Sequence, residues 1–160
     1  MKLNELTIKE AKEGLSKKEF SSVELTTACL RQIRKHNPSL NAFITITEKE
    51  ALESAKKADD LASQGDAFKA SPLLGIPITL KDLFSTKGIK TTAASKVLED
   101  YVPTYDATVV SKLKDAGAVI IGKTNLDAWA HGLSGENSDF GPTKNPWNKE
   151  YVPGGSSSGS

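Results

Sequence analysis

A lysine and a cluster of serines are the residues of this sequence that could do chemistry together. Lys81 directly follows the apolar run Ile76–Leu80 in the segment SPLLGIPITLKD. Burial at the end of a strand disfavours a charged ammonium, so a lysine there can serve as a base near neutral pH. A serine hydroxyl beside such an amine becomes a proton relay or a nucleophile. The segment GGSSSGS, residues 154–160, supplies several serines between glycines that permit close backbone approach.

Each half of this pairing also has a simpler explanation. From its position alone, Lys81 can equally be a strand-end lysine whose ammonium reaches water. Gly/Ser runs usually behave as flexible linkers. However, the stretch that precedes the serines carries Phe140, Trp147 and Tyr151, and linkers seldom hold aromatic residues at that density. The aromatic residues favour an ordered, functional loop from Gly132 onward, although no helix or strand is predicted there.

Other kinds of active site find little support. A Ser-His-Asp triad would need His36 or His131, and no GxSxG segment accompanies either one. His131 follows Asp127 by one helical turn, but a structural or surface role is the preferred interpretation. The GKT segment lacks the upstream glycine of a phosphate-binding loop. The paired carboxylates Asp59 and Asp60 fall on the exterior of a predicted helix, which indicates a solvated surface.

Composition narrows the class of protein. The 160 residues include 21 basic and 20 acidic side chains, for a net charge of +1, so the chain offers no basic face for nucleic acid. Cys29 is the only cysteine, which excludes an internal disulfide and a zinc site built on paired cysteines, and its helical spacing indicates a small buried side chain. No apolar run could span a membrane and no secretory signal is recognised, so a cytoplasmic protein is expected.

The first third of the chain is predicted to be helical. Thr7 with Glu10, and Ser21 with Glu24, form two capping boxes, each followed by apolar residues at helical spacing. The Asn37-Pro38 dipeptide is predicted to stop the second helix.

The later elements follow an α/β pattern. A short strand is predicted at 41–46 and a third helix at 47–65. Buried strands are predicted at 76–80 and 118–121, with a helix capped by Asp106 between them. The segment TNLDAWAHG, residues 124–132, is predicted to be a loop that enters another helix. Helices followed by buried strands indicate an α/β fold with a helix-covered sheet.

Four segments carry a family resemblance. PLLGIPITLKDLFSTKGIKTT, DATVVSKLKDAGAVIIGKTNLDAWA, GPTKNPWN and VPGGSSSGS together resemble the amidase signature family, and within it the amidase subunits of tRNA-dependent amidotransferases. The resemblance is dense over 72–160. It implies the N-terminal part of one amidase domain, in which 1–66 are helical and 67–160 begin a mixed, helix-covered sheet. Ser158 stands where the family commonly has glycine, and WAHGLSGENS differs from the usual FAMGSS.

The resemblance implies a Ser-Ser-Lys triad. Lys81 matches the family's lysine, and Ser156 matches its bridging serine, which follows a cis peptide at Gly155-Ser156. In the family an uncharged lysine takes a proton from the bridging serine, which in turn deprotonates a nucleophilic serine. That nucleophile and the oxyanion hole belong to a DTGGS-type loop, which the resemblance places further along than Ser160.

The resemblance also implies a function and partners. It implies a glutamine amidase subunit that releases ammonia to convert misacylated Glu-tRNA(Gln) to Gln-tRNA(Gln). Two further subunits would complete a heterotrimer, one of them binding the tRNA together with ATP and magnesium, and no cofactor is expected in this chain. Two alternatives stay open. One is a stand-alone amidase of the same family that acts on a small amide, and the other is a non-catalytic helical binding module with a linker tail.

Overall fold

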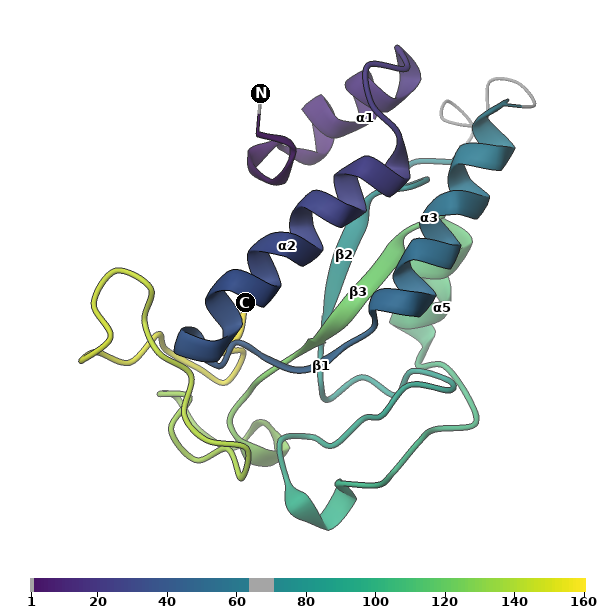
Figure 1. Ribbon diagram of the computed structural model, residues 1–160. Coiled ribbons are helices and arrows are strands. Elements are labelled where there is room, and N and C mark those ends of the chain that lie inside the picture. The colour runs from purple at the N-terminus through teal and green to yellow at the C-terminus, as the bar shows by residue number, and fades with distance from the viewer. Residues whose placement is uncertain (1, 64–70) are drawn as a thin grey trace. The chain divides into compact units, whose positions relative to one another are not determined.

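The computed structural model describes residues 2–63 and 71–160 of the chain (Figure 1). Its helices and strands, in chain order, are α1 (Ile8–Ser16), α2 (Ser22–Leu40), β1 (Phe43–Ile46), α3 (Glu48–Ser63), β2 (Pro77–Lys81), α5 (Thr108–Asp115) and β3 (Val119–Thr124). Short 3-10 turns lie at Leu3–Glu5, Lys96–Leu98 and Ala128–Ala130. The predicted helix end at Gly65 and the predicted boundary between residues 66 and 67 lie outside the described residues.

The strands form one sheet of mixed direction. Its order is β1-β3-β2, and β1 runs antiparallel to β3 with Phe43 opposite Thr124 and Ile46 opposite Gly122. β2 runs parallel to β3, because the bond from Val119 N to Ile76 O is followed further along both strands by the bond from Asp82 N to Thr124 O. All six residues of β3 are buried, as expected for a central strand. The predicted α/β class with a mixed sheet is confirmed.

The chain forms two compact units, each built from separate stretches of sequence. The first comprises Met1–Ile33, Thr47–Ile78 and Ser111–Ile121, and the second comprises Arg34–Ile46, Thr79–Val110 and Gly122–Ser160. β2 and β3 each begin in the first unit and end in the second. Lys81 and Ser156 both lie in the second unit, and so do Asp82 and Lys123.

The first unit holds two apolar clusters. One combines residues of α1, α2 and α3 with Phe20, which lies between α1 and α2, and with the segment before β2; its other members are Ala11, Leu15, Leu25, Ala58, Leu74 and Ile76. The other packs α2 and α3 on β3 through Leu30, Ala51, Ala55, Val119 and Ile121. Cys29 lies beside this second cluster, where burial raises the pKa of its thiol. Small alanines on α3 allow the helix to approach the strand closely.

Both predicted capping boxes are present. Glu10 accepts from the backbone N–H of Thr7 at 2.8 Å, while Thr7 Oγ1 accepts from Glu10 N at 3.3 Å. The same reciprocal bonds join Ser21 and Glu24 at 2.8 and 3.1 Å. The backbone bond from Ser21, followed by its hydroxyl bond, holds the pKa of Glu24 below its ordinary value.

The predicted stop at Pro38 is wrong. α2 continues to Leu40 with Pro38 inside its last turn, and Asn41 N still donates to Asn37 O at 2.8 Å. The side chain of Asn37 then links the helix end to β1, because its Nδ2 donates to Phe43 O and its Oδ1 accepts from Phe43 N. A proline in the final turn removes one helical bond, and these tertiary bonds compensate for it.

The predicted helix after residue 124 is also wrong. Only the 3-10 turn Ala128–Ala130 forms, with Trp129 and Ala130 in the left-handed region at φ 58° and 60°. Residues with a β-carbon rarely adopt this conformation, and it ends any helix. His131, which follows the turn, is exposed.

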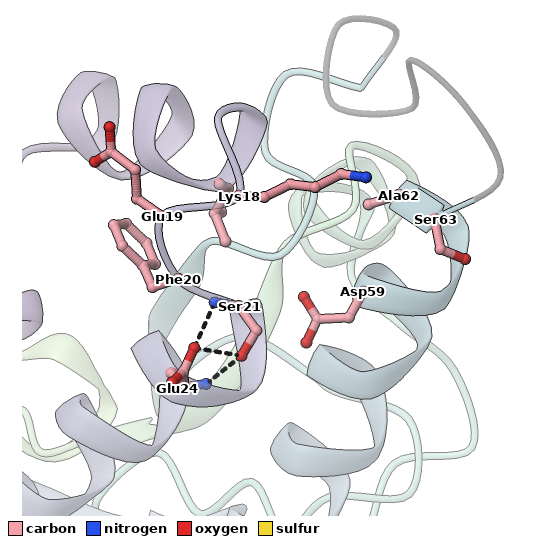
Figure 2. A pocket seen from close by; sticks show the side chains of 9 residues that line it. Lys18, Glu19, Phe20, Ser21, Glu24, Asp59, Ala62 and Ser63 are labelled. Atoms are coloured by element: carbon pink, nitrogen blue, oxygen red, sulfur yellow. Dashed lines mark hydrogen bonds between the residues drawn. The ribbon is translucent and has the colours of Figure 1, made fainter.

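Asp59 does not lie on a merely solvated surface, which corrects the interpretation of the Asp59-Asp60 pair. Its carboxylate points toward the start of α2, where it accepts from Ser22 N at 2.7 Å and from Val23 N at 3.1 Å (Figure 2). A carboxylate at this place satisfies free N–H groups and the positive end of the helix. Asp60, the next residue, is exposed.

Replacing Asp59 by alanine in the full-length protein is therefore expected to loosen the start of α2. Loss of the cap should cost about 1–2 kcal/mol locally, which corresponds to roughly a tenfold faster amide hydrogen exchange at Ser22 and Val23. The matched control, Asp60→Ala, should leave these exchange rates unchanged. Equal effects of the two substitutions would contradict a specific capping role for Asp59.

Candidate active site

Lys81 and Ser156 meet in the second unit. Lys81 is the last residue of β2, and its Nζ donates to Ser156 Oγ at 2.7 Å. Both side chains are half-buried, so the contact lies beside the protein surface rather than in the core. The peptide between Gly155 and Ser156 is cis, as the resemblance implied. The structure thus brings together two residues that are 75 positions apart in the chain.

The backbone from Ser156 to Gly159 is held by the segment that follows β3. Asp127 N donates to the carbonyl oxygen of Ser156 at 3.0 Å. Asn125 N donates to Ala42 O at 2.8 Å, and Asn125 O accepts from Gly159 N at 3.0 Å. The serine-rich segment is therefore bonded at Ser156 and again at Gly159, unlike a flexible linker.

Gly155 is required by close packing. A β-carbon at this position would overlap the carboxylate of Asp127 and would lie 2.9 Å from the carbonyl carbon of Leu133 and 3.0 Å from Ser134 N. Asp127 is fully buried, and its Oδ1 accepts from Gly135 N at 2.9 Å. Three separate stretches of chain therefore converge next to Ser156.

Further side-chain hydrogen bonds hold the region from Gly132 to Ser160, which has no helix or strand. Asn125 Nδ2 donates to Asn41 O and to Gly141 O, each at 3.0 Å. Ser158, where the family commonly has glycine, is buried, and its hydroxyl lies 3.1 Å from that of Thr143 in a hydrogen bond. The described structure of this region opposes the interpretation of residues 133–160 as a linker.

A second lysine of this unit has a different environment. Lys123 on β3 is fully buried, and its Nζ lies 3.2 Å from Oδ1 of the equally buried Asp82. It also donates to Thr91 Oγ1 at 2.7 Å and to Phe84 O at 2.9 Å. Burial lowers the pKa of Lys123, and the Asp82 carboxylate acts in the opposite direction. The pairing of Lys123 with Asp82 was not predicted from the sequence.

A pocket of about 350 Å³ lies in the first unit (Figure 2). Its lining includes Ser21, Glu24 and Asp59 together with Lys18 and Phe20. Its two carboxylates from α2 and α3 are already bound by N–H groups at the start of α2. The carboxylates of Glu24 and Asp59 therefore have a structural explanation as helix caps.

Two further observations concern the described residues alone. Over 2–63 and 71–160, no three His, Cys, Asp or Glu side chains gather as possible metal ligands. Within the same ranges, no helix combines the length and apolar character needed to cross a membrane.

Some contributors to the site could be recognised from sequence and others could not. Lys81 and Ser156 lie in segments that are unusual for their position, at a strand end and between glycines. Asp127 was considered only as a partner for His131, and its carboxylate instead accepts from Gly135. The carboxylate of Asp82, directly after Lys81 in the sequence, was the available signal for the ion pair with Lys123.

Comparison with known proteins agrees with the motifs. The amidase family model matches residues 24–160. The A subunit of glutamyl-tRNA(Gln) amidotransferase from Geobacter metallireducens is 57% identical over 160 residues, which make up 100% of this chain and 32% of that protein.

Solved structures give the same result. The crystal structure of the A subunit of glutamyl-tRNA(Gln) amidotransferase from Thermotoga maritima matches 99% of this chain and 31% of its own with 38% identity and a TM-score of 0.71. The native peptide amidase from Stenotrophomonas maltophilia matches 98% of this chain and 33% of its own with 36% identity and a TM-score of 0.87. The chain spans about a third of the length of these relatives. It belongs to the amidase family, in the amidase signature group that its motifs indicated.

Proposed function

We propose that this chain is part of the glutamine amidase subunit of a tRNA-dependent amidotransferase. The observation that carries the proposal is the 2.7 Å contact between Lys81 Nζ and Ser156 Oγ, which unites the two residues of the family's triad that the chain contains. The 57% identity to the A subunit of a glutamyl-tRNA(Gln) amidotransferase supports the choice of that subunit within the family. The reaction is release of ammonia from the side-chain amide of glutamine.

In this proposal Lys81 is the base and Ser156 is the relay. The amine of Lys81 accepts the proton of Ser156 Oγ across the contact between them. Ser156 in turn takes the proton of a nucleophilic serine, which attacks the amide carbonyl. The proton then returns along the same path to the departing ammonia. The nucleophile and the N–H groups that stabilise the oxyanion belong to the full-length protein outside these 160 residues.

The 160 residues by themselves are therefore expected to release no ammonia from glutamine. Loss of the oxyanion donors alone typically costs about 10²–10³ in rate, and loss of the nucleophile removes the covalent route. The measurement is ammonia release by the purified 160-residue chain and by its Lys81→Ala variant. Activity in the first that disappears in the second would contradict this division of the site.

The proposal includes partners and cofactors. Two other subunits complete a heterotrimer in the cytoplasm, and one of them binds tRNA, ATP and magnesium. This chain holds no cofactor of its own in the proposal. Its net charge of +1 supports the assignment of tRNA binding to a partner, because tRNA recognition needs a basic surface. The ammonia would convert misacylated Glu-tRNA(Gln), or the corresponding Asp-tRNA(Asn), to the amidated product.

One experiment separates this function from that of a stand-alone amidase. The full-length protein is purified with and without the two co-expressed partner subunits of the proposal, and glutamine hydrolysis and Gln-tRNA(Gln) formation are measured. The amidotransferase proposal expects Gln-tRNA(Gln) only with the partners, ATP and glutamine together. A partner-free enzyme that rapidly hydrolyses small amides and forms no complex would favour the stand-alone alternative.

A further inference from the structure

We propose that the buried Asp82–Lys123 ion pair positions Lys81 for proton exchange with Ser156. The inference rests on the function proposed above and adds two residues to its site. Lys81 and Asp82 are neighbours in the chain, yet Lys81 contacts Ser156 while Asp82 contacts Lys123. Consecutive residues at the end of a strand point to opposite sides. The pair therefore acts on the base through the backbone and is a positioning pair.

Asp82 is fixed through its side chain and its backbone. Its Oδ2 accepts from Thr92 N at 2.9 Å and from Thr92 Oγ1 at 2.5 Å, and its Oδ1 faces Lys123 Nζ at 3.2 Å. Its backbone N donates to Thr124 O, and its carbonyl accepts from Ala93 N, both at 3.0 Å. The residue before Asp82 cannot shift without disturbing these contacts.

Lys123, the partner of Asp82, also binds two further residues of the loop that follows β2. It donates to Phe84 O, just after β2, and to Thr91 Oγ1, near the threonine that binds Asp82. Its side chain is 0% exposed, and so is that of Asp82, so water does not compete for these contacts. The ammonium thus joins β3 to both sides of the loop that follows the base lysine.

The pair also supports an unfavourable turn next to the site. Ala93 and Ala94 lie in the left-handed region at φ 51° and 56°, a conformation that persists only when surrounding contacts impose it. Ala93 N bonds to the carbonyl of Asp82, and Ala93 O accepts from Trp129 N at 2.9 Å. Trp129 follows Asp127, whose N–H binds the carbonyl of the bridging serine. Asp82 thus supports both sides of the Lys81–serine contact.

Stability alone does not account for an ion pair at this place. Val119 and Ile121, which precede Lys123 at alternate positions of β3, pack in an apolar cluster. Apolar side chains of similar volume commonly give equal or greater stability than a buried ion pair, because desolvation offsets the attraction between the charges. A fixed geometry is what charged, multiply bonded side chains supply and apolar ones do not.

The test uses the full-length protein, with its partner subunits, and glutamine as substrate. The variants are Asp82→Asn, the double variant Asp82→Asn/Lys123→Met, and Thr92→Val, with Asp59→Asn as a matched control. For each, kcat and KM for ammonia release are measured beside the thermal unfolding temperature. Asp82→Asn is expected to lower kcat by about 10–100-fold with KM within about twofold, as misplacement of a base does.

The double variant separates positioning from stability. It leaves no unpaired buried charge, so its unfolding temperature should recover toward that of the wild type, while kcat stays at least about tenfold low. The control should lose stability at the start of α2 and keep kcat. Recovery of kcat together with stability in the double variant would overturn the inference, as would a folded Asp82→Asn variant with wild-type kcat.

A milder variant covers the case in which the others do not fold. Thr92→Val removes the hydroxyl that binds Asp82 and keeps both the shape and the N–H bond. A fall in kcat of about three- to tenfold at constant KM supports positioning, and an unchanged kcat overturns it. Lys81→Ala in the same series tests the proposed function: if it is inactive while Asp82→Asn is normal, the positioning inference alone fails. If the wild type releases no ammonia from glutamine, or if Lys81→Ala is as active as the wild type, the proposed function and the positioning inference both fail.

Discussion

Lys81→Ala in the full-length protein is expected to lower glutamine hydrolysis by about 10²–10⁴-fold, the usual contribution of a general base. The substitution removes the amine that contacts Ser156 at 2.7 Å and, in the proposed mechanism, leaves the Ser156 hydroxyl without a base. Lys81→Arg is expected to be nearly as damaging, because a guanidinium stays protonated at any working pH and cannot accept a proton. The measurement is kcat for ammonia release under saturating glutamine.

Lys87 provides the matched control for both substitutions. It is an exposed lysine of the loop after β2, and Lys87→Ala and Lys87→Arg should leave kcat unchanged. A Lys81→Arg enzyme with near-wild-type turnover would show that proton acceptance by this side chain is not needed. Loss of activity in the Lys87 variants as well would point to damage of the loop instead of the base.

Gly155→Ala is expected to have the second largest effect, a loss of activity of about 10²-fold or more. A methyl group there would enter the carboxylate of Asp127 and press on the backbone of Leu133 and Ser134, so the chain must move. Ser156 is the next residue, and a displacement of about 1 Å at a reacting group can cost about 10²-fold in rate. The measurement is kcat of the folded, full-length variant.

Ser157→Ala is the control for this substitution. It adds no atoms, lies in the same segment and changes an exposed side chain. Its activity should match that of the wild type. If Gly155→Ala were as active as Ser157→Ala, the serine segment would be free to adjust, and the close approach to Asp127 would not determine the position of Ser156.

Local sequence signals predicted the elements that depend on local contacts. The boxes at Thr7 and Ser21 join residues three positions apart, so their bonds are encoded within each helix start. The strand predicted at 118–121 from its apolar run coincides with the first half of β3, while the second half, Gly122 to Thr124, is equally buried without being apolar. The Lys81–Ser156 contact, in contrast, was reached through family resemblance, because strand-end position alone left the lysine ambiguous.

Contacts outside the predicted element itself, from six to 37 positions away in the sequence, explain the failures. α2 passes Pro38 because the side chain of Asn37 bonds to β1 after the helix. The turn at Ala128–Ala130 replaces a helix because Trp129 N donates to Ala93 O, a residue from an earlier loop. Asp59 caps a helix that begins 37 positions earlier. No periodicity within a segment reports which remote group will satisfy its backbone.

The bond between Asn41 Nδ2 and Gly141 O closes a loop of 100 residues. Closing such a loop in an unfolded chain costs about 2 kcal/mol more than closing one a tenth as long, since the entropic cost rises with the logarithm of length. One hydrogen bond contributes about 1 kcal/mol, so this contact cannot initiate structure by itself. The segment from Gly132 to Ser160, which carries Ser156 and has no helix or strand, is therefore ordered by its contacts with the sheet. The strands must already be paired before Asn41 and Asn125 can bind this segment.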